Sequence, residues 1–202
     1  GAHGSLFVGE YAADYAPELR MVGVVSLDPV SVLTWQMSGA WSGGGFAPWW
    51  VQGQHAGDPT GLPYSEVLKP EAVSRMHLLN EGCMDDVWPT FDDIAGGPLS
   101  RDPMTLPNWA AAFRLSDPGG RRSAPVLLAG GTRFDGDIPA YPHDQHQHYI
   151  DQACALGTSV HFQVFTGGHM AMIEQPVTDY VFAWAAARVR GEVQTGCTKS
   201  GP

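Results

Sequence analysis

The sequence predicts an α/β fold in which a parallel sheet carries helices on both faces, with a second unit inserted into it. Three observations support this prediction. Short apolar runs rich in β-branched residues occur at 21–27, 124–131 and 159–165. Segments with the apolar spacing of helices precede, separate and follow these runs, and such alternation favours a parallel sheet. The stretch between the first two runs lacks a strand pattern and is expected to form a separate helical unit.

The chain opens on a helix and a strand. Aromatic side chains recur every four positions, which places Phe7, Tyr11 and Tyr15 on one helix face. Pro17 ends or redirects this helix. The apolar run "MVGVVSL" then forms the first expected strand, and Asp28 closes it.

Two further strands and two helices are expected in the second half of the chain. Between the second and third apolar runs, apolar residues at helical spacing extend from His146 to Cys154, and Gly157 gives a C-cap signal. The third run alternates apolar with polar residues, as a strand with one covered face does. A last helix begins at Pro176 and stops at Gly191.

This pattern divides the chain into a core, an insertion and a tail. Residues 1–28 and 116–191 are assigned to the α/β core and 29–115 to a helical cap. The polar tail, 192–202, is expected to be loose unless Cys197 anchors it. Six of the seven tryptophans belong to the cap: Trp35, Trp41, Trp49, Trp50, Trp88 and Trp109. Most are expected to fill its core and some to line an apolar pocket, because a small cap has little interior.

Composition and charge narrow the possible functions. The 202 residues include 21 Asp and Glu against 11 Lys and Arg, a net charge of −10. This balance argues against nucleic acid and anionic membrane surfaces as electrostatic partners. No apolar run reaches the ~18 residues that a membrane span needs. The cysteines lack metal-type spacing, and one disulfide with one odd cysteine fits a secreted protein: Cys83, Cys154 and Cys197.

Side chains that could act as a catalytic acid and base follow the second and third expected strands. Asp135 comes after the second strand and His169 after the third. Because parallel strands end at one edge of a sheet, we expect these side chains to meet where open α/β sheets place their active sites. The carboxylate would fix the imidazole tautomer, which leaves the other ring nitrogen to take a proton from a nucleophile. Asp137 and Glu174 are weaker candidates for the acid.

No serine of the chain fits the G-x-S-x-G elbow that carries the nucleophile of such a triad. Ser5, Ser42 and Ser159 each match at most part of the pattern. The elbow motif leads directly into a helix, and this chain opens on one. If Gly1 were the last glycine of the motif, the serine would lie two residues before it. We therefore expect the nucleophile upstream of Gly1 or on a companion chain.

Several segments carry a resemblance to a known family. "GAHGSLFVGEYAADYAPELRMVGVVSLDP" resembles the segment after the catalytic serine in the secretory triacylglycerol lipases of the α/β-hydrolase superfamily. "LKPEAVSRM" and "EGCMDDV" resemble cap segments of that family. "APVLLAGGTRFDGDIP" and "ACALGTSVHFQVFTGGHM" are similar to its acid and histidine loops. The likeness covers nearly the whole chain, with one extra residue before the acid.

The resemblance implies an α/β-hydrolase fold, of which this chain holds the C-terminal half, and serine ester hydrolysis without a cofactor in a secreted protein. The family's acid maps onto Asp135, and His169 would act first as general base and then as general acid. The amino end of the opening helix, at Gly1 and Ala2, would stabilise the oxyanion. Tryptophans of the cap would hold the acyl chain of a lipid or ester substrate: Trp41, Trp49, Trp50 and Trp88.

A partner is expected as well. Three strands alone would leave a long unpaired edge on the first strand. The expected partner is therefore the N-terminal half of the same fold, as a cleaved piece or a separate chain. Two alternatives to the lipase interpretation remain. A serine peptidase or a short-chain acyl esterase uses the same triad on the same fold, and a non-catalytic hydrolase-like binding module would lack a nucleophile altogether.

A metal site and a phosphate site are not expected. His143 and His146 lie one helical turn apart, with His148 beside them, which suits a transition metal. No carboxylate or cysteine cluster in the sequence completes that ligand set, and His146 also fits the apolar face of its helix. The glycines at 43–45 are not followed by Lys-Ser or Lys-Thr, so they do not form a phosphate loop.

Overall fold

The computed structural model describes residues 1–37, 46–119, 124–132 and 141–202, apart from the side chains of Met84, Asp85 and Trp88. The chain divides into two compact units. The first unit consists of Gly1–Val32 and Pro118–Pro202, and the second of Leu33–Asp117. The cap expected from the sequence, 29–115, and the second unit differ by a few residues at each end.

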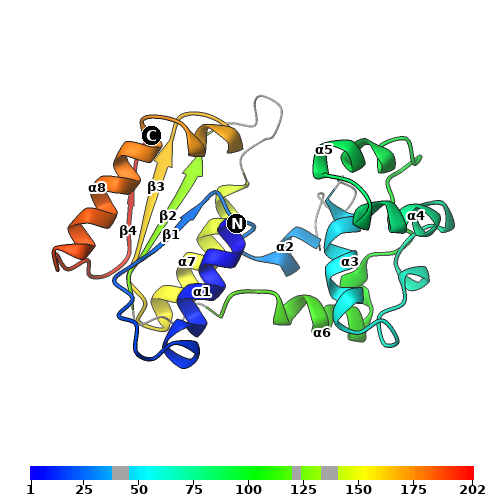
Figure 1. Cartoon of the computed structure of the whole chain (residues 1–202), viewed down its shortest axis with the longest axis horizontal. Coiled ribbons are helices and arrows are strands. Elements are labelled where there is room, and N and C mark those ends of the chain that lie inside the picture. Colours follow the sequence, from blue (N-terminus) through cyan, green and yellow to red (C-terminus); the bar gives the residue numbers. More distant parts are fainter. Residues whose placement is uncertain (38–45, 120–123, 133–140) are drawn as a thin grey trace. The chain divides into compact units, whose positions relative to one another are not determined.

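A four-stranded parallel sheet forms the centre of the first unit (Figure 1). Its strands lie in the order of the sequence: β1 (Val24–Leu27), β2 (Val126–Gly131), β3 (Val160–Phe165) and β4 (Thr198–Ser200). Each neighbouring pair is parallel, so the strands point to the same edge of the sheet. The mixed α/β class predicted from the sequence is confirmed.

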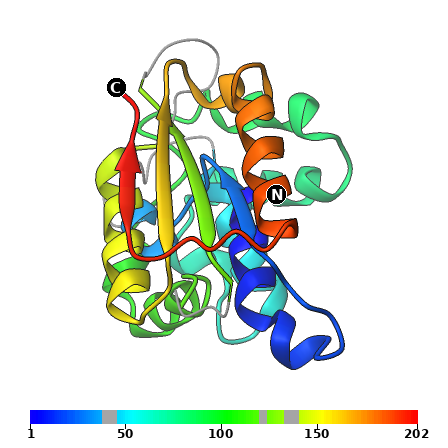
Figure 2. The same ribbon diagram turned by 90° about the vertical axis from the view of Figure 1, so that its left-hand side faces the viewer.

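Helices lie on both faces of this sheet, as Figure 1 and Figure 2 show. The elements are α1 (Ala2–Tyr15) and α7 (His143–Ala155) on one face and α8 (Val177–Val189) on the other, with the short 3₁₀ helix η5 (His169–Ile173) between β3 and α8. On the first face, the Ser26 hydroxyl of β1 donates to the Ala2 carbonyl at 2.7 Å. On the second face, Nε2 of His161 lies 2.8 Å from the Tyr180 hydroxyl of α8.

Burial follows the position of each strand in the sheet. Every residue of β2 is buried, as expected for a strand with a neighbour on each side and helices on both faces. In β3, Val160, Phe162 and Val164 are buried, whereas His161 and Gln163 are partly exposed. The alternation predicted for this strand is therefore confirmed.

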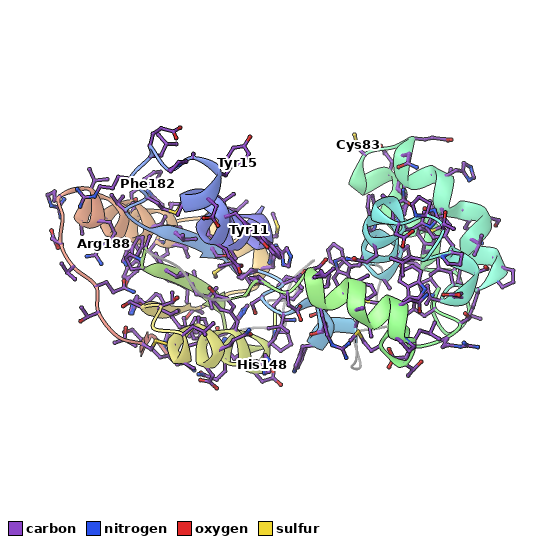
Figure 3. The ribbon with its side chains drawn as sticks, turned by 90° about the horizontal axis from the view of Figure 1, so that it is seen from below. Tyr11, Tyr15, Cys83, His148, Phe182 and Arg188 are labelled. Carbon is purple, nitrogen blue, oxygen red and sulfur yellow. A yellow bond between two sulfur atoms is a disulfide. The ribbon has the colours of Figure 1, made fainter. Side chains whose placement is uncertain are left out.

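The aromatic stripe of α1 is not the buried face of that helix. Leu6 and Gly9 are buried, whereas Tyr11 is 55% and Tyr15 91% exposed. The rings of Phe7 and Tyr11 stack on one another with their centroids 6.1 Å apart. Figure 3 shows Tyr11 and Tyr15 on the outside of the helix. The first unit thus presents an apolar helix face to solvent.

The tail forms the fourth strand and is fastened to the core. A disulfide joins Cys197 to Cys154 at the end of α7, with the two Cα atoms 6.2 Å apart. Directly after it, Thr198–Ser200 pairs in parallel with β3. The tail was expected to be loose unless Cys197 anchors it, and the structure contains that anchor. Cys83 is free and exposed.

The second unit consists of short helices. Its α-helices are α2 (Leu33–Met37), α3 (Ala47–Gly57), α4 (Pro70–Arg75), α5 (Met84–Val87) and α6 (Pro107–Leu115). Its 3₁₀ helices are η1 (Tyr64–Glu66), η2 (Met76–Asn80), η3 (Trp88–Phe91) and η4 (Pro103–Thr105). The one β feature among its described residues is an antiparallel bridge between Leu68 and Leu99.

A tryptophan lies at the centre of the second unit. Trp109 is fully buried, packs against the Phe113 ring at a centroid distance of 6.2 Å and donates from Nε1 to Glu66 Oε2 at 3.0 Å. The prediction that tryptophans fill this core holds for that residue. Among the described residues, none of the helices in either unit combines the length and apolar character that a bilayer crossing requires.

Candidate active site

The carboxylate at the end of β1 is the first element of the site. Asp28 directly follows the strand, and its backbone N–H donates to the Ala129 carbonyl of β2 at 2.8 Å. Its φ of +46° lies in the left-handed region, which Asp and Asn enter more readily than other non-glycine residues. The Asp28 side chain is fully buried. The strand end thus aims a buried carboxylate at the carboxyl edge of the sheet.

The imidazole of His169 comes to this carboxylate from the end of β3. Gly167, with φ +130°, and Gly168 turn the chain sharply, and His169 begins η5. Nδ1 of His169 lies 2.8 Å from Oδ2 of Asp28. The imidazole side chain is 31% exposed and the carboxylate is not exposed at all. The pair is therefore accessible to solvent from the histidine side.

Three donors surround the carboxylate of Asp28. Besides His169, Nε2 of His146 lies 3.2 Å from Oδ1, and the Tyr141 N–H lies 3.2 Å from Oδ1 and 3.1 Å from Oδ2. Burial by itself would raise the pKa of Asp28, but the hydrogen bonds from His146, His169 and the Tyr141 amide outweigh it and lower that pKa below its ordinary value. Asp28 is therefore ionised at neutral pH.

The ionised carboxylate fixes the protonation pattern around it. A carboxylate only accepts hydrogen bonds, so Nδ1 of His169 carries a proton that it donates to Asp28. In the neutral ring, Nε2 of His169 is then an acceptor and can take a proton. No described residue forms a hydrogen bond with this Nε2. The Tyr141 ring and this imidazole pack nearly perpendicular to one another, with centroids 5.6 Å apart.

A second Ser-His-Asp chain ends on the same carboxylate. Oγ of Ser31 lies 3.0 Å from Nδ1 of His146, whose Nε2 faces Asp28. All three side chains are fully buried, so no substrate reaches the Ser31 hydroxyl. The ring is also turned the other way round from a hydrolytic triad, in which Nε2 faces the serine and Nδ1 the carboxylate. Ser31 is thus a partner within a buried network and not a nucleophile.

The amino end of α1 lies beside this network. Nδ1 of His3 donates to the Val30 carbonyl at 2.6 Å, two residues beyond Asp28, and Ser26 binds the Ala2 carbonyl. Figure 1 shows the N-terminus next to the end of β1. The first N–H groups of a helix have no partner within the helix and form its positive pole. Ala2, one of the two expected oxyanion donors with Gly1, is thus held against β1 two residues before Asp28.

The structure describes only some of the residues that the sequence predicts for the site. His169 lies at the sheet edge as predicted, but Asp135 and Asp137 lie outside the described residues, so their pairing with it stays a prediction. Glu174 is exposed and ends η5, and none of its described contacts joins it to His169. The carboxylate that the structure places against His169 is Asp28.

The tryptophans expected to bind substrate are described only in part. Trp49 and Trp50 belong to α3 and are half-buried, and the ring of Trp50 stacks on Phe46 with centroids 5.7 Å apart. Trp41 and the side chain of Trp88 lie outside the described residues.

The histidines of α7 are engaged with protein groups. Nε2 of His143 lies 2.7 Å from the Gly131 carbonyl, and His146 faces Asp28. His148 is exposed on the far side of the helix (Figure 3). Within the described ranges, no group of three or more metal-ligating side chains is found.

Asp28 is the residue that sequence reasoning missed. The sequence pattern assigns it only to the closing of the first strand. The rule applied to Asp135 and His169, a polar side chain at the carboxyl end of a parallel strand, applies equally to it. That signal is present in "VVSLDP". A comparison with known proteins found no family model, curated protein or solved structure that matches this chain.

Proposed function

We propose that this chain is the part of a serine carboxylic-ester hydrolase, a lipase or esterase, that carries the histidine and its acid. The observation that carries the proposal is the pair at the carboxyl edge of the sheet. A fully buried, ionised carboxylate orients a partly exposed imidazole through Nδ1, which leaves Nε2 to act as a base toward solvent. This is the arrangement that general-base activation of a serine hydroxyl requires.

The proposed reaction proceeds in two halves around His169. Nε2 of His169 takes the proton of a serine hydroxyl as its oxygen attacks the ester carbonyl, and it then gives that proton to the leaving alcohol. Water attacks the acyl-enzyme in the second half with the same base. Asp28 stabilises the imidazolium formed in each half. Gly1 and Ala2, at the positive end of α1, stabilise the oxyanion.

The nucleophile is proposed to come from residues outside this chain, upstream of Gly1 or on a partner chain. Within the first unit, β1 is the edge strand of the described sheet, and a groove of about 580 Å³ lies along the outer face of α1. That groove is lined mainly by apolar side chains: Val8, Ala12, Tyr15, Ala16, Leu19, Arg20 and Met21. The proposed occupant is the N-terminal half of an α/β-hydrolase fold, whose strands would extend the sheet beyond β1.

The substrate is proposed to be a lipid or another hydrophobic ester. The half-buried Trp49 and Trp50 of α3 offer aromatic surface for an acyl chain, and Trp41 and Trp88 stay candidates for the same role. The Cys154–Cys197 disulfide supports a secreted protein, because such bonds persist in oxidising compartments.

The test is ester hydrolysis by the complete protein that contains this chain. Turnover of p-nitrophenyl esters of increasing acyl length, set beside a peptide amide, separates a lipase from a short-chain esterase and a peptidase. The proposal expects ester turnover that His169→Ala lowers by about 10³-fold or more. Binding of acyl ligands without turnover of any ester or amide would instead identify a non-catalytic module and overturn the proposal.

A further inference from the structure

The carboxylate of Asp28 is shared between two imidazoles, of which only one is exposed. His169 approaches Oδ2 from η5, and His146 approaches Oδ1 from α7. The His169 side chain is 31% exposed, whereas that of His146 is not exposed at all. The proposed hydrolysis uses His169 alone, so the chemistry leaves the buried imidazole without a role.

The polar groups around the Asp28 carboxylate come from several segments of the chain. The Tyr141 N–H donates to both carboxylate oxygens, His146 comes from α7 and His169 from η5. The phenol of Tyr141 has a raised pKa, first because it is buried and second because of the negative charge of Asp28, so it is neutral at physiological pH. The Asp28 carboxylate is therefore the anion of this cluster, with N–H donors around it.

The other ring nitrogen of His146, Nδ1, also has a hydrogen-bond partner. Oγ of Ser31 lies 3.0 Å from its Nδ1, and both the Ser31 N–H and hydroxyl lie within reach of Gln145 Oε1, at 3.0 and 3.3 Å. The Phe162 ring packs edge-on against the imidazole at a centroid distance of 5.5 Å. These contacts fix the orientation of the His146 ring, so its Nε2–H group points at Oδ1 of Asp28.

We infer that His146 is a positioning residue for His169, acting through Asp28; the inference rests on the proposed function. The Nε2–H donor of His146 fixes Oδ1, which sets the plane of the carboxylate and holds Oδ2 against Nδ1 of His169. Without that donor, Oδ1 keeps only the Tyr141 N–H that it shares with Oδ2, so the carboxylate turns more freely about its terminal torsion, whose energy profile is broad, and His169 loses its fixed orientation. Because proton transfer depends on the exact position of the base, a His169 that is no longer held in place lowers kcat.

Replacing His146 by glutamine or by asparagine, two amides that differ by one methylene, separates a hydrogen-bonding role of this residue from a packing role. In His146→Gln, the side-chain N–H₂ reaches the position of Nε2 and still donates to Asp28. In His146→Asn, the amide is too short to reach it. His148→Gln, on the exposed side of the same helix, is the matched control. Each change is made in the complete protein, and a thermal melt shows that each variant folds.

The first readout is ester hydrolysis. We expect His146→Gln and the control to keep kcat within about 3-fold of the parent, and His146→Asn to lose roughly 10- to 100-fold in kcat with KM changed less than about 2-fold. Equal kcat values for the Gln and Asn variants would overturn the inference.

The second readout does not need activity. The Nδ1–H proton of His169, hydrogen-bonded to a carboxylate, should give a low-field proton resonance in the parent and in His146→Gln, and this resonance should shift upfield or broaden by exchange in His146→Asn. If the parent hydrolyses no ester, the proposed function fails while the resonance still decides the inference. A resonance that is the same in the Gln and Asn variants would overturn it.

Discussion

At the residue scale, Asp28 combines a backbone conformation and a side-chain role that few residues can supply together. Its φ of +46° disfavours most side chains, and Asp and Asn tolerate this region best. Its carboxylate is buried and accepts from two imidazoles and one amide. Asp28→Asn should therefore keep the backbone while it removes the charge, which makes it a clean probe of the site.

The first prediction concerns the identity of the acid. In the complete protein, we expect Asp28→Asn to lower kcat for ester hydrolysis by roughly 10³- to 10⁴-fold, because an amide no longer fixes the tautomer of His169 or stabilises its imidazolium. Asp135→Asn is expected to cost much less. A larger loss for Asp135→Asn than for Asp28→Asn would show that the acid follows the second strand, as the sequence resemblance implies.

The second prediction concerns acid stability. The folded pKa of Asp28 lies below its ordinary value of 3.8, so the unfolded chain takes up this proton first as the pH falls. The stabilisation from Asp28 is then complete above about pH 4 and is lost as the pH falls through the folded pKa. Denaturant unfolding between pH 5 and pH 2 should show this decline, and Asp28→Asn should make it shallower. An equally steep decline in the variant would contradict the assignment.

At the element scale, the turn between β3 and η5 places His169. Gly167 has φ +130°, and a Cβ there would lie 2.5 Å from the Cβ of Ala171 in η5. Gly157, after α7, also has a positive φ, of +84°, but a Cβ there would meet nothing within 4 Å. The two glycines thus differ in steric room rather than in the sign of φ.

This difference gives the third prediction. Gly167→Ala should displace η5 and lower ester turnover by about 10-fold or more, because it moves the histidine relative to Asp28. Gly157→Ala should cost about 1 kcal/mol of stability through the backbone alone and leave turnover close to that of the parent. Equal turnover in the two variants would mean that the turn does not position His169.

The fourth prediction concerns the edge strand β4. The Cys154–Cys197 disulfide closes a loop over a sequence separation of 43 and fastens the strand that comes directly after it. Replacing both cysteines by alanine should lower the free energy of unfolding by roughly 2–4 kcal/mol. Amide exchange at residues 198–200 should become faster in the same variant. Unchanged exchange there would show that pairing with β3 alone holds the strand.

At the scale of the whole molecule, the sequence predicted the mixed α/β architecture with its parallel sheet. Alternating apolar runs and helices indicated the parallel sheet, because burial on both faces of β2 and one face of β3 demands those patterns. The fourth strand escaped prediction because β4 is short and polar and all its residues are exposed, so it is held by backbone pairing and the disulfide rather than by apolar burial.

The contact between Asp28 and His169 shows why side-chain contacts are harder to predict from sequence than a sheet. The interval from Asp28 to His169 spans 141 residues and includes the whole second unit, so only the parallel pairing of β1, β2 and β3 brings the two together. The motif resemblance indicates Asp135 instead. The contact of His146 with Asp28 is equally hidden in the sequence, because a histidine on an apolar helix face gives no sign of which carboxylate it meets.

The central claim is that Asp28 and His169 are the acid and base for a serine that lies outside this chain. Labelling the complete protein with a fluorophosphonate, which reacts with activated serines, and mapping the modified peptide tests it most directly. The account predicts one labelled serine outside residues 1–202 and loss of that label in His169→Ala. A label on a serine within 1–202, or labelling that is unaffected by His169→Ala, would contradict it.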